Sequence, residues 1–241
     1  DGDLPYLHEL IGRYGLADAY HGVARPSQPN YLALFSGSTQ GVDDNDNHDI
    51  AAPSVADQIE ASGRTWAEYA ENVPPGCFTG ASASGGRDGV GEYRRKHAPA
   101  ISFDAIRTDP KRCASIKDLT AFRPGETDFA FIVPNLCHDG HDCPLAQADR
   151  WLSGFAPAIL ESDAFRTDGA LFVTFDEDHT DRDRHGGQVA TIVASPTTPA
   201  GFRSSTPHDH YSLLRTVQTA WGLDCLALSC AADSMAEFFP R

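Results

Sequence analysis

The 241-residue chain is strongly acidic, with a formal net charge of −15 and 41% hydrophobic residues. Its length and apolar content are enough for one sizeable core, so we expect a single domain over residues 1–241. The charge argues against a nucleic-acid binder and against stable association with an anionic membrane, because both need a basic face. It leaves open a small anionic substrate, since a metal ion or a helix N-terminus can reverse the local potential.

The predicted elements alternate between amphipathic helices and short apolar strands. Three apolar runs, 128–133, 170–175 and 189–194, are almost unbroken, as expected of strands buried on both faces of a sheet. This order predicts an α/β domain with a largely parallel sheet. The elements are a helix over 4–14, a strand over 19–24, a helix from Ser27, a helix over 55–61, a strand over 65–70, the strand 128–133, a helix over 145–160, the strands 170–175 and 189–194, and a helix from Tyr211 to Trp221.

Six cysteines and one methionine are typical of an oxidised, exported protein. A structural metal site is the competing interpretation, but the sequence contains no CxxC spacing. The printed sequence shows no signal peptide or membrane span, and we expect a secreted or cell-envelope (periplasmic) location. The simplest disulfide pairing joins the two pairs of sequence neighbours and leaves the remaining two cysteines together: Cys137 with Cys143, Cys225 with Cys230, and Cys77 with Cys113.

Ser27 begins the segment that says most about chemistry. It stands two residues before Pro29, a residue type that suits the first turn of a helix. A hydroxyl at a helix start faces unpaired backbone N–H groups and the positive end of the helix dipole. Such a place suits an oxyanion and lowers the cost of forming an alkoxide. The alternative is a serine that only caps the helix.

Polar side chains also follow two of the apolar strands, at the edge where α/β sheets bind ligands. Asp176 and Glu177 follow the run 170–175, where two carboxylates and a hydroxyl can form a hard, oxygen-rich cation site. The alternative is an acidic surface loop. His138 and His141 lie in a loop that a short disulfide would hold rigid, which helps a phosphate-binding or acid/base role. For either histidine taken alone, simple solvation is the more common interpretation.

Three weaker signals occur elsewhere. The acidic run 43–49 could bind calcium, but it lacks the glycine and distal glutamate of an EF-hand, so a solvated loop is the simpler interpretation. The basic run 94–97 is either a phosphate contact or a plain surface run. His208 and His210 precede the last predicted helix, where histidine often serves only in capping.

Five segments in this order resemble the bacterial phosphoesterase family of acid phosphatases and phospholipase C-type enzymes, within the alkaline phosphatase superfamily. They span nearly the whole chain, and their co-occurrence is far more specific than any one segment. The resemblance implies a three-layer α/β/α sandwich with a mostly parallel central sheet. The segments are PSQPNYLALFSGST, EYRRKHAPAISF, VPNLCHDGHDC, LFVTFDED followed by VATIVASP, and HYSLLRTVQTAWGL.

The resemblance implies a role for each matching residue. Ser27 matches the family's nucleophile, which also contacts the metal, and Asp176 and Glu177 match its acidic metal ligands. His97 and His141 match histidines that line the phosphate pocket. The implied cofactor is a divalent metal cation of unidentified type.

Three further residues are candidate substrate contacts. Asn30 follows the nucleophile on the same helix, and His138 shares the predicted disulfide loop. Arg25 stands where the family often has histidine, and its guanidinium can help to hold an anionic group. The family pattern also opens with a strand that ends in a Glu-Asn pair and completes the metal site. No matching pair precedes Leu4, so we expect this chain to lack that strand and to have an incomplete metal site.

The sequence therefore predicts a secreted, metal-dependent phosphoric ester hydrolase that acts on a small phosphorylated substrate through a phosphoserine at Ser27. Its compact length favours a phosphomonoesterase, similar to acid phosphatases, over a phosphodiesterase of the phospholipase C type. A non-catalytic exported binding module with a degenerate metal site is the alternative from another class. The sequence has no GxSxG motif, which argues against a serine carboxylesterase.

Overall fold

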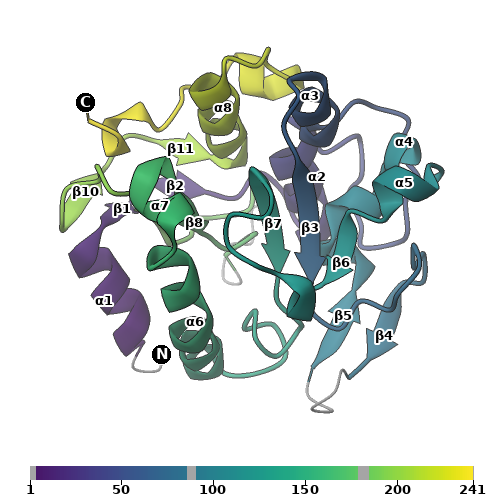
Figure 1. Ribbon diagram of the computed structural model, residues 1–241, viewed down its shortest axis with the longest axis horizontal. Coiled ribbons are helices and arrows are strands. Elements are labelled where there is room, and N and C mark those ends of the chain that lie inside the picture. Colours follow the sequence, from purple (N-terminus) through teal and green to yellow (C-terminus); the bar gives the residue numbers. More distant parts are fainter. Residues whose placement is uncertain (1–3, 86–90, 179–184, 241) are drawn as a thin grey trace.

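A computed structural model describes residues 4–85, 91–178 and 185–240 of the chain. The strands are β1 (Gly15–Ala17), β2 (Tyr20–His21), β3 (Trp66–Ala70), β4 (Ser82–Ser84), β5 (Glu92–Arg94), β6 (Ile116–Asp118), β7 (Phe129–Val133), β8 (Leu171–Val173), β9 (Thr191–Ala194), β10 (Phe202–Ser204) and β11 (His208–Asp209). Two main sheets have the strand orders β6-β3-β7 and β10-β1-β9-β8 (Figure 1). Two smaller pairs, β11-β2 and β4-β5, lie outside them.

Helices pack around both sheets. The α-helices are α1 (Pro5–Arg13), α2 (Ser27–Ser36), α3 (Val55–Ala61), α4 (Asp104–Arg107), α5 (Pro110–Cys113), α6 (Leu145–Leu160), α7 (Asp163–Asp168) and α8 (His210–Trp221). The 3-10 turns are η1 (Arg95–His97), η2 (Pro99–Ser102), η3 (Leu119–Ala121), η4 (Ala227–Cys230) and η5 (Ala236–Phe238). Within the described ranges, none of these helices is long and apolar enough to cross a membrane.

The strand directions confirm an α/β fold with mixed, largely parallel sheets. β3 runs parallel to both of its neighbours, β6 and β7, and β1 runs parallel to β10. β9, however, runs antiparallel to both β1 and β8. A parallel neighbour needs a long crossover, usually through a helix, and the described part of the connection from β8 to β9 contains none.

The predicted strand over 19–24 is wrong in its bounds. The chain instead forms β1 and β2, separated by a turn at Asp18 and Ala19. β1 joins the four-stranded sheet, whereas β2 pairs with β11, so the chain must leave one sheet for the other at this turn. Beyond β2 the backbone is held by the side chain of Asn30, which binds the N–H groups of Val23 and Ala24 in place of a strand partner.

Strand β7 lies at one edge of the three-stranded sheet, and β8 lies at one edge of the four-stranded sheet. In the described part of the chain these two edge strands do not pair with each other. Their side chains were expected to be buried on both faces. Instead all of β8 and four of the five residues of β7 are only half-buried, whereas every residue of the inner strands β3 and β9 is buried. The apolar runs therefore have the composition of interior strands but stand at sheet edges.

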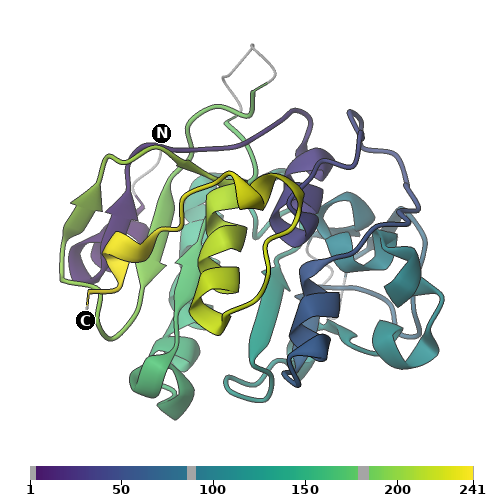
Figure 2. The same ribbon diagram turned by 90° about the horizontal axis from the view of Figure 1, so that it is seen from above.

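Helix α8 joins the two halves on one face. Leu214 packs with α2 and α3 against Trp66 of β3, while Leu213 packs with the core around Val193 of β9. Figure 2 shows α8 between the strands of the two sheets. Gly37 ends α2 in the left-handed conformation, with φ +72°, and lies so close to the backbone that a Cβ there would stand 2.1 Å from the Leu226 carbonyl oxygen.

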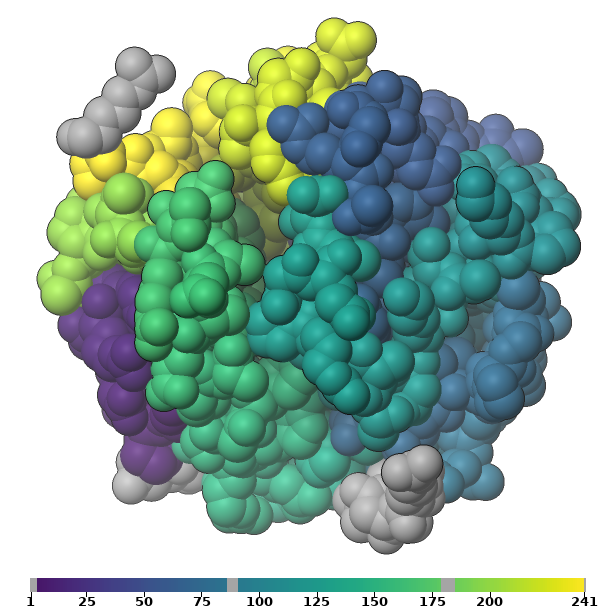
Figure 3. Space-filling view, in the orientation of Figure 1, coloured from purple at the N-terminus to yellow at the C-terminus, as the bar shows by residue number. Residues whose placement is uncertain are grey.

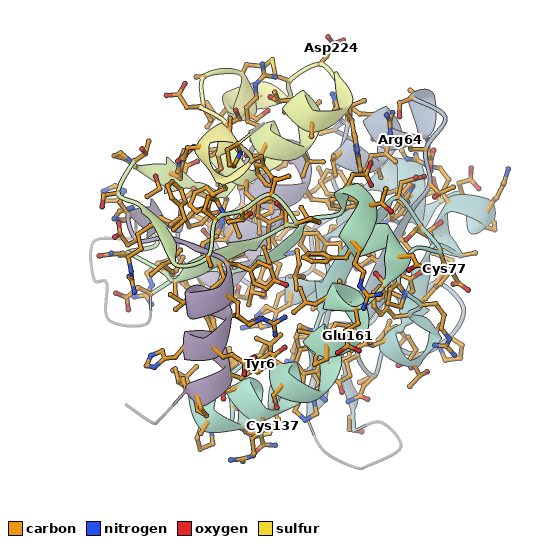
Figure 4. All side chains as sticks on the ribbon, turned by 60° about the vertical axis from the view of Figure 1, so that its left-hand side comes forward. Tyr6, Arg64, Cys77, Cys137, Glu161 and Asp224 are labelled. Carbon is orange, nitrogen blue, oxygen red and sulfur yellow. A yellow bond between two sulfur atoms is a disulfide. The ribbon has the colours of Figure 1, made fainter. Side chains whose placement is uncertain are left out.

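The opposite face is closed by α1, α6 and the segment 119–128. Backbone N–H groups of Tyr6 and Leu7 donate to the buried carboxylate of Asp149 and tie α1 to α6; Figure 4 shows side chains filling the space between these helices near Tyr6. Across the junction, the Phe122 ring lies 5.4 Å from that of Phe155 on α6. The teal and green atoms of these segments adjoin in Figure 3.

The three predicted disulfide pairings are confirmed. Cys77 is bonded to Cys113, across 36 residues of sequence, whereas the other two bonds close short loops. The bond from Cys137 to Cys143 closes the loop after β7, and the bond from Cys225 to Cys230 closes the turn after α8. Among the described residues no cysteine is free, which supports an oxidising compartment for the protein.

The buried carboxyl of Glu68 should make stability depend on pH. One oxygen accepts a hydrogen bond from the Ala100 N–H, and burial raises the pKa of Glu68 from its ordinary 4.5 to about 8. Between these pH values the folded protein keeps a proton that the unfolded chain has released. The free energy of unfolding should therefore fall as pH rises through this range.

Glu68→Gln mimics the protonated carboxyl, so we expect it to remove the contribution of Glu68 to this pH dependence. The change in the free energy of unfolding that the substitution causes should be more favourable at pH 8.5 than at pH 4.5 by roughly 2–5 kcal/mol. Urea unfolding at a series of pH values measures the difference, with the exposed Glu126→Gln as control. Parallel pH profiles for wild type and Glu68→Gln would contradict this assignment.

Candidate functional site

Ser27 is not a helix cap. It is the first residue of α2, and the N-cap position belongs to Pro26, which makes no side-chain cap. The Ser27 side chain is almost fully buried, and its Oγ donates a hydrogen bond to Glu177 Oε1 at 3.4 Å. The hydroxyl thus stands at the positive end of α2 and faces a carboxylate from the segment after β8.

Asn30 holds the turn that leads to Ser27. Its Oδ1 accepts from the N–H groups of Val23 and Ala24, and its Nδ2 donates to the carbonyl oxygens of Ala24 and Pro26. The side chain is completely buried. These four contacts use the hydrogen-bonding capacity of Asn30 on the backbone, so the side chain holds the turn before Ser27 and leaves no donor or acceptor for the predicted substrate contact.

Asp176 and Glu177 lie in the turn after β8. Glu177 Oε2 accepts from Arg25 Nε at 2.7 Å, and the Asp176 carboxylate accepts from the Glu177 N–H. Arg25 therefore reaches the site through Glu177, and its cation lies next to the carboxylate.

The donor set beside Ser27 can be compared with the predicted metal site. Two carboxylates and a hydroxyl are hard oxygen ligands, and this chemistry fits a divalent cation. No group of three or more His, Cys, Asp or Glu side chains is arranged to hold a metal within the described ranges. The two carboxylates and the hydroxyl therefore fit part of a coordination sphere for such a cation.

His97 is held from two sides. Its Nδ1 lies 3.2 Å from Asp139 Oδ2, and its ring stacks on Tyr31 with a centroid distance of 4.9 Å. The imidazole is buried, and its Nε2 has no hydrogen-bond partner among the described residues. A buried ring nitrogen without a partner is costly unless something else binds it, so Nε2 is the atom available to a ligand.

Lys96 and His141 lie beside His97. The His141 ring centroid is 5.8 Å from that of His97, and Lys96 Nζ lies 3.2 Å from His141 Nε2. Burial lowers the pKa of Lys96, with nearby carboxylates of Asp176 and Asp139 opposing the change. The two histidines named from the sequence are thus brought together, with a half-buried ammonium between them and the acidic turn.

Tyr31 connects the two sides of the site. Burial raises the pKa of its hydroxyl well above the usual value, and the charges of Asp176, Asp139 and Glu177 add to this effect. The phenol therefore stays protonated. Asp176 and Glu177 from the turn after β8 and Asp139 beside His97 all act on this one hydroxyl, so Tyr31 lies near both parts of the site.

His138 makes its contacts elsewhere. Its Nδ1 lies 2.9 Å from Glu71 Oε2, and its ring stacks on Trp151 of α6 at 5.7 Å. The Glu71 carboxylate also accepts from the Asn135 N–H. These partners give His138 a structural role in the loop after β7, and its substrate contact stays a prediction.

Tyr31, Lys96 and Asp139 were missed as site residues, although each adjoins a residue that was chosen. Lys96 lies in the basic run 94–97, and Tyr31 lies four residues after Ser27, one turn along the helix. Asp139 follows His138 directly in the disulfide loop. Residue type gave no reason to prefer Asp139 to the other carboxylates of that loop, because only its pairing with distant His97 distinguishes it.

The acidic loop 43–49 is not arranged as a calcium site. Asp44 Oδ1 lies 2.6 Å from His48 Nε2, and Asp49 pairs with Arg95 and Arg107. The carboxylates of Asp44 and Asp49 are thus engaged by imidazole and guanidinium groups. Asn45 instead accepts a hydrogen bond from the Gln28 N–H, directly after Ser27, so this loop contributes to the frame of the nucleophile.

Solved structures share the fold at low sequence identity. A phosphonate monoester hydrolase from Silicibacter pomeroyi has a TM-score of 0.62 at 11% identity, with 98% of this chain and 72% of that chain covered. A protein of the alkaline phosphatase superfamily from Vibrio parahaemolyticus has a TM-score of 0.58 at 11% identity, with 92% and 61% covered. The expected alkaline phosphatase-like fold is therefore confirmed.

Relatives in sequence are closer. A probable acid phosphatase of Kluyveromyces lactis is 34% identical over 85% of this chain and 50% of its own length. An acid phosphatase of Aspergillus fumigatus is 31% identical over 89% of this chain and 50% of its own length. A phosphatidylinositol-3-phosphatase of Mycobacterium tuberculosis is 29% identical over 91% and 70%.

The chain spans about half the length of the fungal relatives that it matches. Because these relatives are fungal, the predicted restriction to bacteria is too narrow. The sequence profile of the Phosphoesterase family matches residues 1–224, nearly the whole chain. The chain therefore belongs to the Phosphoesterase family.

Proposed function

We propose that this chain is the catalytic domain of an exported phosphoric ester hydrolase that cleaves phosphomonoesters through a phosphoserine at Ser27. The observation that carries the proposal is the approach of Ser27 Oγ, at the start of α2, to Glu177 Oε1. A helix N-terminus favours the negative charge of both an alkoxide and a phosphoryl group. The names of the related acid phosphatases support the same chemistry.

The proposed metal ligands are Asp176, Glu177 and Ser27. A divalent cation bound there would lower the pKa of the Ser27 hydroxyl and neutralise a non-bridging phosphate oxygen. Glu177 also aligns the hydroxyl, because it accepts its hydrogen bond.

The proposed reaction has two chemical steps, transfer of the phosphoryl group to Ser27 and hydrolysis of the phosphoserine. The Ser27 alkoxide forms a bond to phosphorus while the bond from phosphorus to the leaving oxygen breaks, and His97 Nε2 gives a proton to that oxygen. A water molecule then attacks the phosphoserine and returns its proton to His97, while Ser27 leaves as the alkoxide. Inorganic phosphate and the free alcohol are the products.

The side chains around His97 suit this role. Asp139 fixes the ring through Nδ1, so that Nε2 alone faces a ligand. Lys96, whose Nζ donates to His141 Nε2, supplies a positive charge and hydrogen-bond donors beside it and can stabilise the charge on the transferring phosphoryl group. An anionic substrate thus meets a local group of cationic and helix-dipole donors on an acidic protein.

A phosphodiesterase of the phospholipase C type is the second candidate. The mycobacterial relative is named for a phosphatidylinositol phosphate, which supports a lipid as the alcohol part of the substrate. The phosphate removed from such a lipid is a monoester, so this name does not itself favour diester cleavage. A non-catalytic binding module is the third candidate, and stoichiometric metal content separates it from both enzymes.

Ser27→Ala should abolish turnover, with at least about a 10³-fold loss of kcat, because no phosphoserine can form. Circular dichroism and thermal unfolding should remain near wild type, since Oγ makes a single long hydrogen bond. Hydrolysis of p-nitrophenyl phosphate and bis-p-nitrophenyl phosphate, each with and without chelator, measures the effect. Chelator should stop the wild-type reaction.

The outcomes of this assay discriminate among the candidates. Faster cleavage of the diester would favour the phospholipase C-type enzyme. No hydrolysis of either compound by full-length protein with added metals would favour the binding module. A Ser27→Ala enzyme with a near-normal rate would exclude the phosphoserine mechanism.

Asp139→Asn should slow hydrolysis in a way that depends on the leaving group. Without the Asp139 carboxylate, the protonated form of His97 is less stabilised and its ring is less well oriented, so phenyl phosphate should lose about 10–100-fold in kcat. p-Nitrophenyl phosphate should lose far less, because p-nitrophenolate leaves without protonation. The ratio of the two rates is the measurement.

Glu71→Gln serves as the matched control for Asp139→Asn. Glu71 pairs with His138, which is the carboxylate–imidazole pair next along the chain. Among the described residues neither Glu71 nor His138 forms a hydrogen bond or ion pair with Ser27 or His97. We expect Glu71→Gln to leave the ratio of the two rates unchanged. An equal loss on both esters in Asp139→Asn would show that His97 is not the proton donor.

A further inference from the structure

His210 lies behind the acidic turn and contacts its backbone. Its Nε2 is 2.7 Å from the Asp176 carbonyl oxygen, and its Nδ1 is 3.0 Å from the Tyr20 hydroxyl. Both side chains are completely buried. The helix cap that the sequence suggested for this position is supplied by Asp209, which accepts from the Ser212 N–H, so His210 has no part in capping α8.

The hydrogen bonds fix the direction of donation. A carbonyl oxygen can only accept, so Nε2 of His210 carries the hydrogen that points at Asp176. In the neutral ring Nδ1 is then an acceptor, and the Tyr20 hydroxyl donates to it. The order Tyr20, His210, Asp176 is thus a one-way chain of hydrogen bonds that ends on the backbone of a proposed metal ligand.

The topology brings these groups together from distant segments. β2 and β11 pair in parallel, with Tyr20 opposite His208 and His21 opposite Asp209, which places the first residue of α8 beside Tyr20. A second segment fixes the same carbonyl from another side. A Cβ on Gly22 would stand 2.6 Å from the Asp176 oxygen, so only glycine allows this approach.

The Asp176 carboxylate is linked to this anchored carbonyl. Its Oδ1 accepts from the Glu177 N–H, which lies in the same peptide unit as the Asp176 carbonyl. Rotation of that peptide would therefore move the Asp176 carboxylate and carry Glu177 away from Ser27. One buried donor, His210 Nε2, resists this rotation.

We propose that His210 is a positioning residue whose hydrogen bond to the Asp176 carbonyl sets the geometry of the acidic turn and thereby its affinity for a divalent cation. The inference rests on the proposed metal site of the function above. Groups that orient metal ligands typically account for about 10–100-fold in affinity when they are removed.

The test uses the full-length protein, stripped of metal, and titrates Mn²⁺ by calorimetry. His210→Phe keeps the ring shape but removes the donor, and we expect about a tenfold or greater rise in the dissociation constant. His210→Gln restores a donor near the position of Nε2 and should return the constant to within about threefold of wild type. Tyr20→Phe, which removes only the outer hydroxyl, should fall between them and provides a measurement even if His210→Phe fails to fold.

His208→Phe is the matched control. His208 lies two residues away and is also buried. Its Nε2 lies 2.7 Å from Glu237 Oε1, and among the described residues it forms no hydrogen bond with the acidic turn. We expect this variant to unfold at a lower temperature and to bind Mn²⁺ as wild type does, which separates a stability effect from positioning.

Two outcomes would overturn the proposal, and they differ from each other. Wild-type affinity in both His210→Phe and Tyr20→Phe would refute the positioning role while leaving the metal site intact. Wild-type full-length protein that binds no Mn²⁺ would refute the proposed metal site itself, together with any residue said to position it.

Discussion

The proposed site depends on one approach between the two halves of the molecule, that of the Ser27 hydroxyl to the Glu177 carboxylate. Ser27 begins α2, whose Leu32 and Phe35 pack in the core beside β3. Glu177 follows β8, which belongs to the other sheet. The two sheets share no strand pairing, so their relative position relies on side-chain packing and on contacts between the loops. Arg25 adds an ion pair of 2.7 Å to Glu177 across the same boundary.

This arrangement explains why α8 is central to both fold and site. Adjacent leucines, 213 and 214, enter different cores, so one helix holds both halves on the same face. The first residue of that helix is His210, which binds the Asp176 carbonyl. Packing that fixes α8 between the sheets therefore also fixes the acidic turn. The edge strands β7 and β8 contribute mostly half-buried apolar side chains, so less apolar area is buried there than on the inner strands β3 and β9.

The sequence predicted the parts of this fold whose signals are local. Unbroken apolar runs located β7 and β8 within two residues at each end, and the spacing of cysteines predicted all three disulfides. The strand over 19–24 failed because pairing partners on different sheets, and not propensity, decide where β1 and β2 divide. Ser27 and His141 were proposed from their places at a helix start and in a disulfide loop, whereas His97 was named through a resemblance. Asn30 and His138 were assigned to substrate because residue type alone cannot reveal that a carboxamide is saturated by backbone or that an imidazole pairs with Glu71.

The side chains of the site carry an excess of negative charge, as does the whole chain with its net charge of −15. Three carboxylates, Asp139, Asp176 and Glu177, lie close enough to Tyr31 to affect its hydroxyl. A phosphate would be repelled by this group unless cations faced it. Arg25 and Lys96 supply fixed positive charge, yet Arg25 is already paired with Glu177 and burial makes the charge of Lys96 less favourable. The protein side chains alone therefore leave the acidic turn undercompensated, and a bound divalent cation is the simplest way for the same turn to attract a phosphoryl group instead of repelling it.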